Sequence, residues 1–88
     1  MATLEEVIQT IEDIEKLLPL IKDKFSRDSK DNLFSLGKSC LESCQINSAK
    51  TAKAIDPAIL ENLKRGFSDV LKAINMELEM EKLEEDNS

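Results

Sequence analysis

The stretch LEEVIQTIEDIEKLLPLIKDKF, residues 4–25, returns to an apolar side chain at every third or fourth position. This heptad spacing is typical of an amphipathic helix that packs against other helices. Thr3 and Glu6 at its start fit a capping box, in which the Thr3 side chain accepts a hydrogen bond from the Glu6 amide. We therefore predict a helix over about residues 3–26. Its apolar seam consists of Leu4, Val7, Ile11, Ile14, Leu18, Ile21 and Phe25.

Two features qualify this first helix. Ile8 and Leu17 widen the seam, which favours a helix touching two neighbours over a simple two-stranded coiled coil. Pro19 interrupts the helix without shifting its register, and we expect it to kink the helix rather than break it. The alternative is a short gap after which Pro19 starts a second helix.

Two further helices follow, at about residues 30–54 and 57–83. Residues 26–31 read as the first turn, and Asp56 before Pro57 is a good N-cap for the last helix. Gly37 lies on the apolar face of the middle helix, where glycine costs helix stability. We therefore expect another helix to approach closely there. The last helix carries an apolar face of Ile59, Leu60, Leu63, Phe67, Val70, Leu71, Ile74 and Leu78.

Composition and helix lengths together predict the fold. With 41% hydrophobic and 34% charged residues, two glycines and two prolines, the 88-residue chain has the composition of a folded helical protein. It is too short for two independent cores. We predict an all-α fold: one domain over residues 1–84, built as an antiparallel three-helix up-down-up bundle. A long helical hairpin completed by dimerisation is the alternative.

Cys40 and Cys44 are the only cysteines and stand four residues apart. On a helical wheel they fall within the apolar stripe of the middle helix, beside Leu33, Leu36 and Leu41. A buried thiol behaves as a small hydrophobic group, so we expect both cysteines to pack in the core. Redox or metal chemistry at this pair is the alternative.

Several function classes find no support in the residues. The chain has no histidine, and no nucleophile–base pair, cofactor loop or set of four metal ligands can be assembled from it. We therefore expect no enzyme activity, no cofactor, no metal and no small-molecule substrate. A net charge of −6 without a basic stripe argues against nucleic-acid binding. No membrane span or signal peptide is evident, so we expect a cytoplasmic protein.

The acidity is concentrated near the C-terminus. Residues 77–88 hold six acidic residues and one lysine, a net charge of −5. Because these acids lie at the negative end of the helix dipole, we expect residues 77–88 to form a partly frayed tail. Met76, Met80 and Leu83 line one side of this region at helical spacing, opposite the main seam. Methionine adapts to varied surfaces, so these three residues are candidate partner-binding residues, together with Leu20 off the first seam.

These observations favour a small interaction protein: an adaptor, inhibitor, immunity factor or secretion-type chaperone that docks by helix-to-helix contact. The alternative is a self-associating structural module, a homodimer for instance, with no separate partner.

Overall fold

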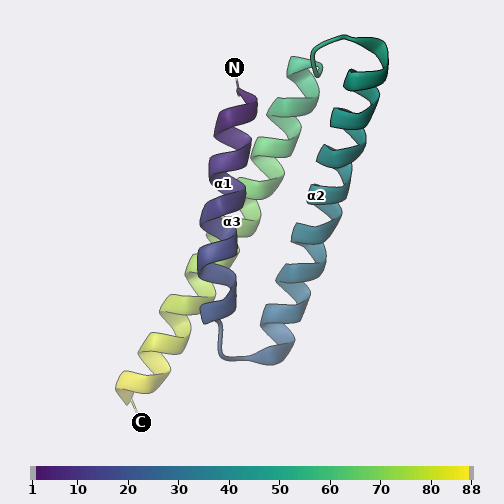
Figure 1. Ribbon diagram of the computed structural model, residues 1–88. Coiled ribbons are helices and arrows are strands. Elements are labelled where there is room, and N and C mark those ends of the chain that lie inside the picture. Colours follow the sequence, from purple (N-terminus) through teal and green to yellow (C-terminus); the bar gives the residue numbers. More distant parts are fainter. Residues whose placement is uncertain (1, 88) are drawn as a thin grey trace.

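A computed structural model describes residues 2–87 of the chain. In this range the chain forms three α-helices: α1 (Leu4–Leu17), α2 (Lys24–Thr51) and α3 (Pro57–Asn87). A short 3₁₀-helix, η1 (Leu18–Leu20), follows α1. α1 and α3 run in one direction and α2 in the other, so the predicted antiparallel three-helix bundle is confirmed (Figure 1). The bundle is elongated, with extents of 56 × 23 × 16 Å.

The first helix is shorter than predicted. Its start is confirmed, since the Glu6 amide donates to Thr3 Oγ1 at 3.2 Å. It ends at Leu17, however, and Pro19 lies in η1, after which Ile21 is extended (φ −68°, ψ 123°). The kinked continuous helix over residues 3–26 is therefore wrong, and the short gap is closer to the structure. Proline has no amide hydrogen for the next helical bond and crowds the preceding turn, which explains the break.

The second helix starts earlier than predicted, at Lys24, because the break at Pro19 ends the first helix early. Asp23 caps it, accepting a hydrogen bond from the Ser26 amide at 2.9 Å, so residues 26–31 are helix rather than turn. Arg27 Nη1 donates to the Ile21 carbonyl at 2.9 Å and ties this first turn to the extended residue. Phe25, assigned from the sequence to the seam of the first helix, belongs to α2 and is 83% exposed.

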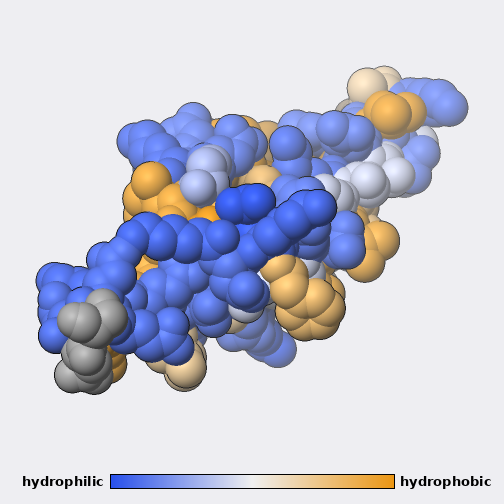
Figure 2. Space-filling model, turned by 90° about the horizontal axis from the view of Figure 1, so that it is seen from below, coloured by the Kyte–Doolittle hydropathy of each residue, from blue (hydrophilic) through white to orange (hydrophobic). Residues whose placement is uncertain are grey.

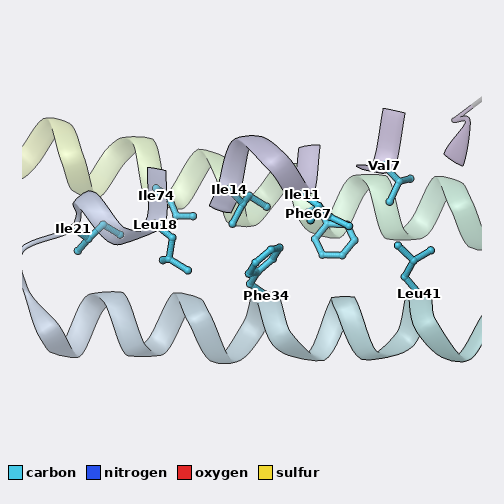
Figure 3. Packing of buried hydrophobic residues seen from close by; sticks show 9 residues of the cluster. All are labelled: Val7, Ile11, Ile14, Leu18, Ile21, Phe34, Leu41, Phe67 and Ile74. Carbon is cyan, nitrogen blue, oxygen red and sulfur yellow. The ribbon is translucent and has the colours of Figure 1, made fainter. Parts of the chain in front are cut away.

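The core lies between α1, η1 and α3, with α2 closing one side. Figure 3 shows its nine buried side chains, with Phe34 and Leu41 reaching in from α2. The rings of Phe34 and Phe67 meet edge to face, with centroids 5.9 Å apart. Beside them, α2 approaches α3 closely at Gly37, where a Cβ atom would meet the Phe67 ring. The predicted close approach is confirmed. The nine residues are Val7, Ile11, Ile14, Leu18, Ile21, Phe34, Leu41, Phe67 and Ile74.

The connection between α2 and α3 contains a strained residue. α2 ends at Thr51, three residues before the predicted end, and Ala52 adopts a left-handed conformation with φ 55°. The Ala52 amide donates to the Ser48 carbonyl, as in helix C-caps. Asp56 then caps α3 as predicted: its Oδ1 accepts a hydrogen bond from the Ala58 amide at 2.8 Å.

α3 continues beyond its predicted end at residue 83. It is helical to Asn87 and projects past the connection between α1 and α2 (Figure 1). The prediction that the tail frays from residue 77 is wrong for the described residues, which are helical. Instead, Glu81 receives hydrogen bonds from the backbone amides of Lys22 and Asp23 and ties the tail to that connection.

Candidate interaction surface

α2 carries two apolar stripes on different sides of the helix. The buried stripe contains Phe34 and Leu41, seven residues apart, and faces α1 and α3. The second stripe contains Leu33, Leu36 and Cys40, spaced i, i+3 and i+7, so these residues share one side of the helix. Phe25 begins the same side two turns earlier. We call these four residues, Phe25, Leu33, Leu36 and Cys40, the α2 outer face.

The α2 outer face is open to solvent. Phe25 is 83% exposed, and Leu33 and Leu36 are each more than half exposed. Cys40 is exposed as well. Apolar patches interrupt the hydrophilic surface also in the view from below (Figure 2). Burying one large apolar side chain stabilises a protein by about 1.5–3 kcal/mol, so a row of such side chains left in water is a substantial unused driving force.

The segment that carries Leu33, Leu36 and Cys40 has very few charges. Between Asn32 and Ala49 the only charged residues are Lys38 and Glu42, in a chain that is 34% charged. Glu42 follows Leu33 by nine residues and therefore lies on the opposite side of the helix. The exposed positions beside Leu33, Leu36 and Cys40 are Asn32, Ser35, Ser39 and Ser43.

Lys38 is engaged with the bundle rather than with this face. Its ammonium lies 5.3 Å from the centre of the Phe34 ring and 3.5 Å from Glu15 of α1. The contact with Phe34 lies within α2, and the contact with Glu15 crosses from α2 to α1. The core packing of Phe34 and Leu41 therefore determines which residues of α2 form the outer face.

The structure overturns the expectation for the cysteines. Cys40 is exposed and Cys44 is partly buried, and both are free thiols. A helical wheel does not separate the two stripes of α2, because Leu33, Phe34, Leu36 and Leu41 are all apolar. Leu41 and Cys40 are about 100° apart around the helix, and the core selects Leu41. The scarcity of charge between residues 32 and 49 was the signal in the sequence for a second, exposed stripe.

The four candidate residues chosen from the sequence are all exposed. Met76, Met80 and Leu83 share one side of α3, and Leu20 ends η1; each is more than half exposed. Glu81, beside Met80 in the sequence, points toward the connection between α1 and α2, so the Met76–Met80–Leu83 side faces elsewhere. We call Met76, Met80 and Leu83 the α3 patch, and its role stays a prediction.

Charged side chains gather where α3 passes the connection between α1 and α2. The Glu81 carboxylate accepts from the Lys22 amide at 2.9 Å and from the Asp23 amide at 3.1 Å. These two backbone hydrogen bonds, with that from Lys22 the stronger influence, hold the pKa of Glu81 below its ordinary value. Lys22 also pairs with Glu85. Glu81 and Glu85 therefore hold α3 against the connection between α1 and α2.

A second ion pair fastens the other end of the bundle. Lys64 of α3 donates a hydrogen bond to Glu6 of α1. That hydrogen bond lowers the pKa of Glu6 and raises the pKa of Lys64. Nearby, the Ala2 amide donates to Glu61 at 2.9 Å. These contacts lie on α1 and α3 and leave α2 without an ion pair at this end among those described.

Other hollows offer little for chemistry. An apolar groove of about 380 Å³ lies between Leu4, Ile55 and Leu60, with Gln45 and Ser48 at its edge. It holds no acid, base or thiol. Among the described residues, no three His, Cys, Asp or Glu side chains come together to hold a metal ion. None of the helices described between residues 2 and 87 is long and apolar enough to cross a membrane.

Comparisons with protein-family models, with curated protein sequences and with solved structures gave no match.

Proposed function

We propose that this chain is a non-catalytic protein–protein interaction module that docks by helix-to-helix contact through the α2 outer face. The observation that carries the proposal is a row of exposed apolar side chains, of which Leu33, Leu36 and Cys40 lie on a helix segment almost without charge. Adaptors, inhibitors, immunity factors and secretion-type chaperones are the classes of protein that work in this way.

Composition supports the choice of surface. Charged residues are depleted at the centre of protein interfaces, whereas ordinary solvated helix faces are rich in them. Leu33, Leu36 and Cys40 lie at i, i+3 and i+7, the spacing with which a helix places its anchors in a partner's groove. Phe25 adds an aromatic side chain at one end, and it is the most exposed of the large hydrophobic residues described.

The α3 patch supports a second surface for the same function. Met76 and Met80 are exposed, and methionine side chains fit partners of varied shape. Acidic residues 77, 79 and 84 stand around the patch, which suits a contact whose rim is polar. The α2 outer face is the stronger candidate because it holds four apolar residues against three, and because no acidic residue lies between Asn32 and Leu41.

The test is site-specific photo-cross-linking. A benzoylphenylalanine at position 36 should form covalent adducts with another protein chain, either in the purified protein or in the native cell extract. The same group at position 12, an exposed site on α1, is the matched control. A third site at position 80 reports on the α3 patch. Adducts equally strong at positions 12 and 36, or absent from position 36, would reject the α2 outer face.

A further inference from the structure

Building on the proposed function, we propose that the α2 outer face docks on the same face of a second copy of this chain. The two α2 helices lie antiparallel about a two-fold axis beside Leu36, and together they complete a hydrophobic layer that one chain leaves open. Surface area, charge distribution and residue spacing each support this occupant.

The surface area of the single chain is too large for a compact monomer. It exposes 6194 Å². A folded monomer of 9.9 kDa is expected to expose about 5,200 Å². The excess of about 1,000 Å² is close to the roughly 800 Å² that each partner buries in a standard interface. A second copy docked on one face of the chain would bury an area of this order.

The charges of the chain favour self-docking at this face. Two copies with a net charge of −6 each repel one another over most of their surface. A two-fold interface brings one surface patch onto itself, so any charge there meets its own sign near the axis. The α2 outer face has no charged member, and residues 32–37 beside the proposed axis have none either. Arg27, Asp28, Lys30 and Asp31, between Phe25 and Leu33, sum to zero net charge. This is the described apolar stripe on which a copy can be placed without opposing like charges.

The acidic tail fixes the direction of the pairing. α3 projects past the connection between α1 and α2, at the end where α2 begins (Figure 1). Residues 77–88 carry a net charge of −5. A parallel pairing would place both tails at one end of the dimer, whereas an antiparallel pairing places them at opposite ends. Antiparallel helices also oppose their dipoles favourably.

The spacing of apolar residues sets the register. Leu33, Leu36 and Cys40 are centred on Leu36, so an axis beside Leu36 lets Leu33 of one copy meet Cys40 of the other. Ser29 then faces Cys44 of the second copy, and Phe25 reaches the polar end of the opposite helix near Asn47. Short serine and cysteine side chains at these positions allow the two helices to approach closely.

The first experiment measures the mass in solution across a concentration series by sedimentation equilibrium. The wild-type chain should reach twice its monomer mass, and Leu36→Asp should remain monomeric while keeping its helical circular dichroism. Leu36 is 66% exposed in the single chain, so this change leaves the core intact. Ile59→Asp, at an exposed position of α3 outside both surfaces, is the matched control and should dimerise as the wild type does. Met80→Asp tests whether the α3 patch forms the dimer instead. A wild type that stays monomeric, or a loss of dimer in Met80→Asp but not in Leu36→Asp, overturns the proposal.

The second experiment tests direction and register with a short bismaleimide. In a Cys40→Ser, Cys44→Ser background, Leu36→Cys should cross-link efficiently to its own copy. Ser29→Cys should not, because the two thiols would be about 22 Å apart along the helices. A mixture of Ser29→Cys in that background with a Cys40→Ser chain that retains Cys44 should cross-link between the two chains. Efficient self-cross-linking of Ser29→Cys would show parallel helices and reject the arrangement.

The results separate this proposal from the proposed function. If the photo-reactive group at position 36 captures only a different protein and the chain is monomeric, the interaction surface stands and the second copy is rejected. If position 36 captures nothing, both fall.

Discussion

Gly37 lies so close to Phe67 that a Cβ atom on the glycine would stand 2.7 Å from Cε1 and 3.0 Å from Cζ of the ring. Phe67 is only 2% exposed, and the Phe34 ring packs against it edge to face. The Phe67 ring therefore has no room to move aside. This contact is where α2 and α3 come together, and it fixes which side of α2 faces the core and which faces solvent.

We expect Gly37→Ala to destabilise the protein. Replacing glycine by alanine inside a helix ordinarily stabilises by about 0.5–1 kcal/mol, but here the added methyl group overlaps the Phe67 ring. Overpacking of a core costs about 1–3 kcal/mol, so the net effect should be a loss of unfolding free energy. Urea unfolding followed by circular dichroism measures it.

Gly66→Ala is the matched control within α3. A Cβ at position 66 meets no atom within 4 Å, so only the helix-propensity gain of about 0.5–1 kcal/mol remains. The two glycine substitutions should change stability in opposite directions. A shared sign would show that the close contact of Gly37 with Phe67 does not govern the packing of α2.

Glu81 should make the stability of the protein depend on pH under acidic conditions. Its folded pKa lies below the ordinary 4.5 because the Lys22 and Asp23 amides donate to its carboxylate. The stabilisation is complete above pH 4.5, the value in the unfolded chain, and is lost as the pH falls through the lower folded pKa. Glu81→Gln should therefore unfold more easily at pH 7 and lose less stability than the wild type on acidification.

Glu79→Gln is the control for this pH dependence, because Glu79 is exposed on the same helix two residues away. Denaturant titrations of the three proteins at pH 7 and pH 3 provide the comparison. If Glu81→Gln and Glu79→Gln lose stability equally between these pH values, the two backbone hydrogen bonds do not hold the tail in place.

Ala52→Gly should stabilise the connection between α2 and α3. Ala52 has φ 55°, and the left-handed conformation costs a residue with a Cβ roughly 1–2 kcal/mol that glycine avoids. Part of this gain is offset by the greater freedom of glycine in the unfolded chain, so we expect a net increase of about 1 kcal/mol in unfolding free energy.

Ala49→Gly is the control for Ala52→Gly and should have the opposite effect. Ala49 is exposed within α2, where glycine costs about 0.5–1 kcal/mol. Thermal unfolding at fixed protein concentration distinguishes the two variants. A lower melting temperature for Ala52→Gly would mean that the left-handed residue is not strained.

The bundle was predictable because its signals are strong and local. Heptad spacing, the Thr3 cap and the Asp56–Pro57 boundary each predict the same helices, and the structure confirms these starts. The boundary at Pro19 was not predictable from spacing, because the apolar register continues through Ile21 to Phe25. Ile21 does enter the core, but as an extended residue stabilised in place by Arg27 and the neighbouring cap.

The candidate surface was harder to predict, since apolar character alone does not tell a buried stripe from an exposed one. On α2 the choice depends on Gly37 and Phe34, which fit against Phe67, a partner distant in the sequence. The same holds for the tail. In the sequence Glu81 is one of several acids near the end of a helix, but in the structure it accepts hydrogen bonds from the amides of residues 22 and 23. Both outcomes depend on tertiary contacts that a helical wheel does not contain.

The two thiols provide a direct test of the α2 geometry. In the Leu36→Asp variant, which we expect to be monomeric, Cys40 should react with a maleimide well before Cys44, because Cys40 is exposed and Cys44 is partly buried. Mass spectrometry of quenched samples gives the order of labelling. In the wild type, Cys40 should become protected as the protein concentration rises into the range where the dimer forms. Equal rates for both thiols in the variant would contradict the assigned orientation of α2, and a Cys40 rate independent of concentration in the wild type would contradict its place at the two-fold interface.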